Sequence, residues 1–191
     1  MHGDQHANMS GWLWFYAKHT PGCRVCADAT WVMNSDAVPQ PDIALRILPE
    51  YGGNTRSIGK YAGGAPELIV EVSDSSSSRD LGVKLELYQR SGVKEYLTIL
   101  LKPKRVIWRQ LTRGRYKEIQ PQEDGVICSR VFPGLWLEPS EVWNLDLPGM
   151  PSLALGVKSP EHAAFVRKLA EKHKKQVMVG AAGLEPATSC V

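Results

Sequence analysis

The sequence predicts an α/β fold, in which a mixed central sheet is flanked by helices. Residues 68–72, Leu-Ile-Val-Glu-Val, are apolar on both faces, which is the pattern of a strand in the middle of a covered sheet. Residues 79–91 then have helical periodicity, with Asp80 in the first turn and Gly92 just beyond the end. Strand patterns resume at about Val93, so helices and strands alternate along the chain.

The segments before the central strand predict one helix and two strands. Residues 5–18 place apolar side chains at helical spacing, and the Thr-Pro-Gly turn at 20–22 ends that helix. Residues 23–33 and 43–48 have the apolar patterns of adjacent strands. Residues 49–65 are dominated by glycine and polar side chains, so a long loop is expected there.

The segments after the second helix predict antiparallel strands. Residues 95–101 and 106–111 form a hairpin across the Lys-Pro-Lys turn at 102–104. Shorter strands are expected further along, at residues 116–119, 126–131 and 135–137.

The domain assignment places the main core in residues 1–147. Residues 148–156 are rich in proline and glycine and predict a linker, after which an amphipathic helix starts at Ser159 and ends in a lysine cluster. Residues 180–191 are small and without periodicity, so we expect a disordered tail. Residues 148–191 therefore form a peripheral linker, helix and tail in this prediction.

Composition excludes several classes of protein. The 191 residues are 43% hydrophobic and 23% charged, which excludes wholesale disorder. The formal charge of only +3 means that affinity for polyanions must depend on where the charges lie. No apolar run approaches the ~18 residues that span a bilayer, and the start of the sequence lacks the features of a signal peptide. We therefore expect a cytoplasmic protein that does not associate with a membrane. Four cysteines are too few for a disulfide scaffold, and the Cys23–Cys26 pair lacks the second pair that a zinc site needs.

Three ionisable side chains break the local patterns. Asp42 stands at the mouth of an apolar strand, Glu71 interrupts the most hydrophobic strand, and Lys84 falls on the helix stripe that should be buried. These groups are expected to meet at one end of the sheet, with the two carboxylates holding a divalent cation and the ammonium beside them. Mg²⁺ favours oxygen ligands and retains several waters, so two acids suffice. A structural interpretation stays open, in which Glu71 and Lys84 form a buried salt bridge and Asp42 caps a turn.

Four blocks in fixed order resemble the Uma-type family of restriction endonucleases, within the PD-(D/E)XK nuclease superfamily. They are Pro-Asp at 41–42, Ala-Pro-Glu-Leu-Ile-Val-Glu-Val-Ser at 65–73, Arg-Asp-Leu-Gly-Val-Lys-Leu-Glu-Leu-Tyr at 79–88 and Gly-Val-Lys-Glu-Tyr at 92–96. The resemblance covers roughly residues 6–143. It implies a restriction-endonuclease-like core and metal-dependent hydrolysis of phosphodiester bonds.

The resemblance also implies roles for the same three residues. Asp42 matches the acid of the Pro-Asp motif and Glu71 the acid of the second motif, whereas Ser73 stands where the superfamily has a lysine. Lys84 matches the helix lysine that replaces this superfamily lysine in the Uma-type pattern. Family members usually carry a further hairpin before the first helix, so the domain of residues 1–147 is expected to be truncated at its N-terminus.

Residues 102–117 contain seven lysines and arginines and no acidic residue, with Trp108 and Tyr116 interleaved. This pattern is typical of a strip that follows nucleic-acid phosphates and stacks on bases, or of a solvated hairpin, and the second interpretation is slightly favoured. In the first interpretation, Arg109 and Arg113 would contact the phosphates.

The leading hypothesis is an endonuclease that hydrolyses DNA, with Mg²⁺ or Mn²⁺ held by Asp42 and Glu71 and with Lys84 as the catalytic cation. The alternative is a catalytically inactive nuclease-fold module that binds DNA or another partner. Because superfamily members often work as dimers, a homodimer is a further expectation.

Overall fold

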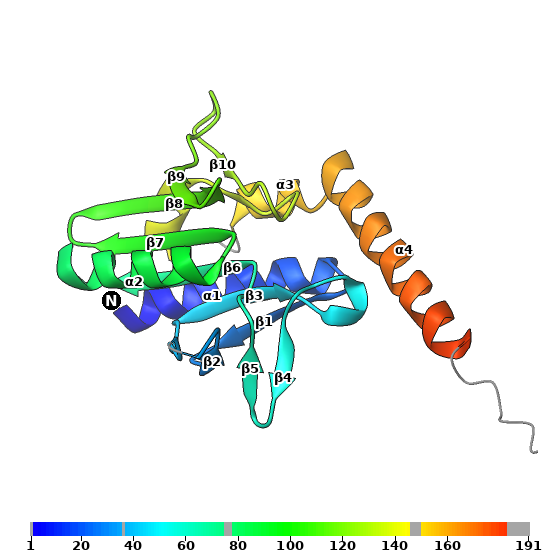
Figure 1. The fold of residues 1–191 in the computed structure, drawn as a ribbon. Coiled ribbons are helices and arrows are strands. Elements are labelled where there is room, and N and C mark those ends of the chain that lie inside the picture. The colour runs from blue at the N-terminus through cyan, green and yellow to red at the C-terminus, as the bar shows by residue number, and fades with distance from the viewer. Residues whose placement is uncertain (1, 36, 75–77, 146–149, 183–191) are drawn as a thin grey trace, which may run out of the picture.

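A computed structural model describes residues 2–35, 37–74, 78–145 and 150–182, without the side chains of 78–81 and 180–182. Its centre is a six-stranded sheet in the order β1-β3-β6-β7-β8-β9. These strands are β1 (Cys23–Ala27), β3 (Ile43–Ile47), β6 (Leu68–Ser73), β7 (Glu95–Leu101), β8 (Lys104–Thr112) and β9 (Arg115–Glu118). Helices α1 (His2–His19) and α2 (Ser78–Ser91) flank it (Figure 1). The predicted α/β architecture is therefore confirmed.

The sheet is mixed because only β6 and β7 run parallel. A parallel pair needs a long crossover, which α2 supplies between these two strands. Alternation along β6 turns Leu68, Val70 and Val72 toward the core that contains α1, and Ile69 and Glu71 toward α2. The most apolar strand of the sequence thus lies in the interior of the sheet, as its pattern predicts.

The N-terminal half differs from the prediction in two places. Residues 23–33 form two strands rather than one, because the chain turns at Asp28, with φ of 49°, and β2 (Trp31–Val32) joins another sheet. The prediction of a long loop over residues 49–65 is wrong. This segment contains the 3-10 helix η1 (Pro49–Tyr51) and the strands β4 (Arg56–Ile58) and β5 (Tyr61–Gly63). These strands are three residues long, too short for alternation to be recognised.

The C-terminal part contains further short elements. They are β10 (Ile127–Cys128), β11 (Trp136–Leu137), the 3-10 helix η2 (Pro139–Trp143), α3 (Pro151–Gly156) and α4 (Pro160–Ala182). The predicted strand at 126–131 is confirmed only over its Ile-Cys pair, and the predicted linker is helical over 151–156. Its proline and glycine mark the two ends of α3, and Leu153 of this helix is buried in the main core.

Helix α4 extends outward from the body (Figure 1). Its first half is attached rather than peripheral, because Leu169 is buried in the core and the ring of His173 stacks on Tyr51 at a centroid distance of 4.4 Å. The tail predicted at 180–191 is helical over 180–182, and residues 183–191 lie outside the described part of the chain. No helix in the described residues is long and apolar enough to span a bilayer.

Gly156→Ala is expected to destabilise the fold by about 1–3 kcal/mol, the usual cost of overpacking. A methyl group at Gly156 would collide with the carbonyl oxygen of Gly134, because α3 packs closely against the loop before β11 at this point. Chemical denaturation of the wild type and the variant measures this loss. Gly11→Ala in α1 is the control, since its added methyl group meets nothing within 4 Å and alanine favours a helix. Equal stability of Gly156→Ala and the wild type would contradict the close contact.

Candidate active site

The Glu71 carboxylate lies at the interface between the sheet and α2. Its side chain is only 3% exposed. Each oxygen has a donor from α2: Lys84 Nζ lies 2.7 Å from Oε2, and the Tyr88 hydroxyl donates to Oε1 at 2.6 Å. Lys84 and Tyr88 are four residues apart and therefore share one helix face. The helix thus orients the buried acid through two side chains.

Asp42 lies immediately before β3, the strand next to β6 in the sheet. The antiparallel register pairs Ile43 with Val70, so its continuation places Asp42 opposite Glu71. Asp42 Oδ2 accepts the Val72 N–H at 2.7 Å. The structure therefore brings Asp42, Glu71 and Lys84 together at one place on the α2 side of the sheet.

The Asp42 main chain is also held from outside the sheet. Its carbonyl oxygen accepts the Asp28 N–H at 3.0 Å, and His6 Nε2 from α1 lies 3.3 Å from the same oxygen. His6 also lies 3.8 Å from the Asp28 carboxylate. The start of α1 is therefore connected to the segment that positions Asp42.

Burial raises the pKa of Glu71 above its usual range, against the hydrogen bonds from Lys84 and Tyr88, and the neighbouring Asp42 raises it further. A buried acid beside a second acid is a site where added positive charge is favoured. Lys84 supplies part of that charge, but its side chain is 42% exposed. The expected burial of Lys84 is therefore only partial: its side chain is half-exposed, while its ammonium contacts the buried Glu71.

Tyr88 is the site residue that the sequence pattern did not single out. It falls on the same helix stripe as Lys84, and a tyrosine on an apolar stripe is usually interpreted as core packing. Burial, followed by the nearby Glu71, raises the pKa of Tyr88 well above its usual range, so its hydroxyl stays protonated and donates to the acid. Its spacing of four residues from Lys84 is the signal that could have identified it.

The donor chemistry of this pair fits a hard divalent cation. Among the described residues, no group of three or more His, Cys, Asp or Glu side chains is arranged to hold a metal ion. Two carboxylates alone suit Mg²⁺, which keeps several of its waters, and do not suit a zinc site with four protein ligands. The three bonds to Asp42 and Glu71 named above occupy three of about eight lone-pair positions on two ionised carboxylates, so acceptor capacity remains for a cation.

Two other features of the sequence have structural roles. Cys23 packs against the core on the α1 side and Cys26 against the core on the α2 side, so their thiols do not face a common ligand. Trp108 is fully buried, with its Nε1 donating to Glu95, and the Tyr116 hydroxyl donates to the Val93 carbonyl. These two aromatic rings are therefore engaged within the fold, which weighs against the less favoured interpretation of residues 102–117, a strip that stacks on bases.

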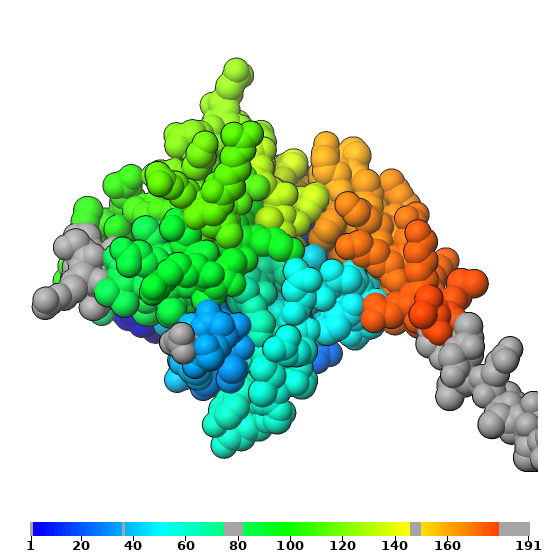
Figure 2. All heavy atoms as spheres, viewed as in Figure 1, coloured from blue at the N-terminus to red at the C-terminus, as the bar shows by residue number. Residues whose placement is uncertain are grey.

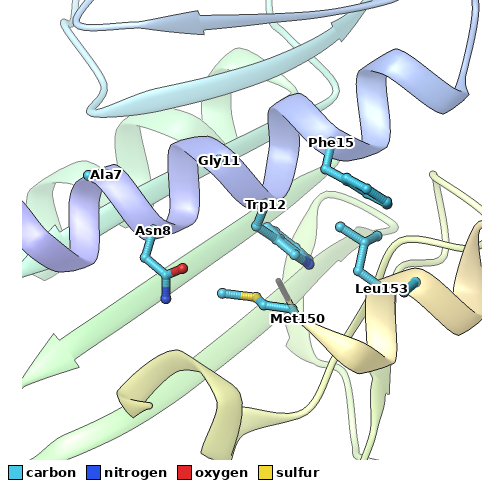
Figure 3. A pocket seen from close by; sticks show the side chains of 8 residues that line it. Ala7, Asn8, Gly11, Trp12, Phe15, Met150 and Leu153 are labelled. Carbon is cyan, nitrogen blue, oxygen red and sulfur yellow. The ribbon is translucent and has the colours of Figure 1, made fainter. Parts of the chain in front are cut away.

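An apolar hollow of about 390 Å³ lies between α1 and α3 (Figure 3). Trp12 and Phe15 of α1 line it with Met150 and Leu153, and none of the described residues that line it is ionisable. Within the described part of the chain, the hollow therefore offers no acid, base or cation for chemistry, and the candidate site remains the Asp42–Glu71 pair.

A mixed sheet with a helix on each face and two acids on adjacent strands defines a restriction-endonuclease-like α/β protein. The chain belongs to the family described as "Uma2: Putative restriction endonuclease", whose sequence model matches residues 1–140. A solved structure from Anabaena variabilis ATCC 29413, described as a putative nuclease belonging to DUF820, has a similar fold with a TM-score of 0.57. At 14% identity, the alignment covers 76% of this chain and 82% of that one. No curated protein matches the chain.

Proposed function

We propose that this chain is a divalent-metal-dependent endonuclease that hydrolyses DNA phosphodiester bonds. The observation that carries the proposal is the buried Glu71 carboxylate, opposite Asp42 and bound by Lys84. Family membership supports the same chemistry. Cutting both strands of a duplex in one binding event would use two such sites, so a homodimer belongs to this proposal.

Each residue has a distinct role in the proposed reaction. Asp42 and Glu71 hold Mg²⁺ or Mn²⁺, which when bound stabilises charge on the phosphate and lowers the pKa of a bound water. Tyr88 fixes the orientation of Glu71 through its hydroxyl. Lys84, whose side chain is half-exposed, neutralises a phosphoryl oxygen beside the carboxylates.

One observation favours a non-catalytic module instead. Glu67 and Lys94 form a similar pair near the other end of β6, where a half-exposed lysine lies 3.4 Å from a buried carboxylate. The Glu71–Lys84 contact could thus be a second structural ion pair of the same kind. Metal binding separates the two functions, because only the nuclease requires it.

Calorimetric titration with Mn²⁺ compares the wild type, Glu71→Gln and the matched control Glu67→Gln. Substitution of supporting groups around metal ligands weakens metal affinity by about 10- to 100-fold, so loss of a ligand is expected to cost at least that much. Glu71→Gln should lose binding and metal-dependent nicking of supercoiled plasmid, while Glu67→Gln keeps both. Mn²⁺ affinity that is unchanged in Glu71→Gln would favour the non-catalytic module.

A further inference from the structure

A polar pocket of about 430 Å³ lies between the β4–β5 hairpin and the edge of the central sheet. The hairpin projects from the body of the molecule (Figure 2). Among the described residues, the pocket is lined by two cations and by hydroxyl groups and by no carboxylate; the residues used below are Thr30, Arg46, Ser57, Lys60 and Tyr61. This donor set is separate from the Asp42–Glu71 pair.

Arg46 lies in an unusual electrostatic position. It pairs directly with Arg24 across β1 and β3, and like charges at opposite positions destabilise a sheet. Its guanidinium carbon lies 5.8 Å from the Trp31 ring centroid. Its Nε is buried and has no hydrogen-bond partner among the described residues. An acceptor in the pocket would complete this unmatched donor.

Lys60 brings a second cation to the pocket. It occupies the two-residue turn of the hairpin, between the paired residues Ile58 and Tyr61, and its Nζ lies 5.3 Å from the Tyr61 ring centroid. Within the described part of the chain, neither Arg46 nor Lys60 forms an ion pair with a carboxylate. The hydroxyls of Thr30 and Ser57 add further donors. No carboxylate of the described residues therefore neutralises the positive charge of the pocket.

The pocket faces the same side of the sheet as the candidate active site. Alternation along β3 places Asp42 and Arg46 on one face, because Ile43 and Leu45 turn to the α1 side. Four residues of strand separate them by about 13 Å. A short stretch of one nucleic-acid strand can span that distance.

We propose that this pocket binds a phosphate group, with Arg46 and Lys60 as its main contacts. The guanidinium fork and an ammonium are the usual partners of phosphate oxygens. Where the phosphate belongs to DNA, an assignment that rests on the proposed function, the contact positions the strand relative to Asp42 and Glu71. The pocket itself does not depend on that function.

Calorimetric titration with inorganic phosphate at fixed ionic strength tests the pocket in the wild type, Arg46→Gln and Lys60→Gln. Arg56→Gln is the matched control, since Arg56 belongs to the same hairpin but alternates to the face opposite Ser57. Each pocket variant is expected to weaken phosphate binding at least tenfold, and the control is expected to match the wild type. Lys60→Gln, in an exposed turn, keeps the test valid if Arg46→Gln fails to fold. Equal phosphate affinity in all four proteins, or no binding to the wild type, overturns the proposal.

Fluorescence anisotropy with a 20-base-pair duplex, without divalent metal and at several salt concentrations, identifies the source of the phosphate. A DNA contact predicts weaker binding and a salt slope smaller by about one in each pocket variant. Loss of phosphate binding with an unchanged duplex slope supports the pocket as a site for the free anion. Glu71→Gln is expected to bind phosphate normally. Absence of metal-dependent nicking by the wild type therefore overturns the proposed function alone, and absence of phosphate binding to the wild type overturns this inference alone.

Discussion

Lys84→Gln is expected to slow metal-dependent plasmid nicking by about 10²- to 10³-fold, the usual cost of removing one group that stabilises developing charge. The Lys84 ammonium lies 2.7 Å from Glu71 and its side chain is half-exposed, so Lys84 can reach both the acid and an incoming phosphate. Glutamine can still donate a hydrogen bond to Glu71 but carries no charge. Mn²⁺ binding should persist or tighten, because one cation is removed from beside the two carboxylates.

Lys94→Gln is the control for this prediction. Lys94 lies 3.4 Å from the buried Glu67 and is 45% exposed, close to the value for Lys84, so the two substitutions remove similar ion pairs. Each substitution leaves a buried carboxylate without its charged partner, so both variants are expected to lose stability to a similar extent in chemical denaturation. A nicking rate that falls equally in the two variants would assign Lys84 a structural role.

The sequence predicts the acids and the lysine of the candidate site because these residues break strong local patterns. Glu71 stands in a strand that is otherwise apolar, and Lys84 stands on an apolar helix stripe, so burial physics alone isolates both. Their contact depends on the crossover between β6 and β7, and the helix between those strands is itself predictable. The exposure of Lys84 could not be predicted, because it depends on how far α2 stands from the sheet.

The parts that the sequence does not predict lack such a local signal. The β4–β5 hairpin consists of three-residue strands, and its pairing with β2 joins segments about 30 residues apart. Arg46 has the ordinary pattern of a polar residue in a strand, and only the register reveals that it faces Arg24. The phosphate pocket therefore depends on tertiary contacts that no window of sequence contains.

Glu95 is another buried acid, and the local sequence pattern does not reveal it, because it begins β7 and strand ends are usually exposed. It is fully buried and has four donors. The Arg130 and Val131 N–H groups lie 2.6 and 3.1 Å from Oε1, and the Ser129 hydroxyl and Trp108 Nε1 lie 2.7 and 3.2 Å from Oε2. One carboxylate thus connects β7 to β8 and to the loop after β10.

Burial raises the pKa of Glu95 to about 7, although its hydrogen bonds to Ser129, Arg130, Val131 and Trp108 oppose the rise. An acid whose pKa is higher in the folded state than in the unfolded chain contributes stability below its unfolded pKa and loses it as pH rises through the folded pKa. Between pH 4.5 and 7 the free energy of unfolding of the wild type should therefore fall relative to Glu95→Gln. The full difference is on the order of 3 kcal/mol, since one pKa unit is worth about 1.4 kcal/mol.

Urea denaturation of both proteins at intervals across this pH range measures the difference, and subtraction removes the titration of the other groups. Glu118→Gln, which changes an exposed carboxylate of the same sheet in the same way, is measured alongside as the control. Glu95→Gln should also be less stable than the wild type at pH 4, because its amide places an N–H donor against the Trp108 N–H. A wild-type advantage that grows with pH would contradict the prediction, since the four donors would then outweigh burial and favour the ionised acid.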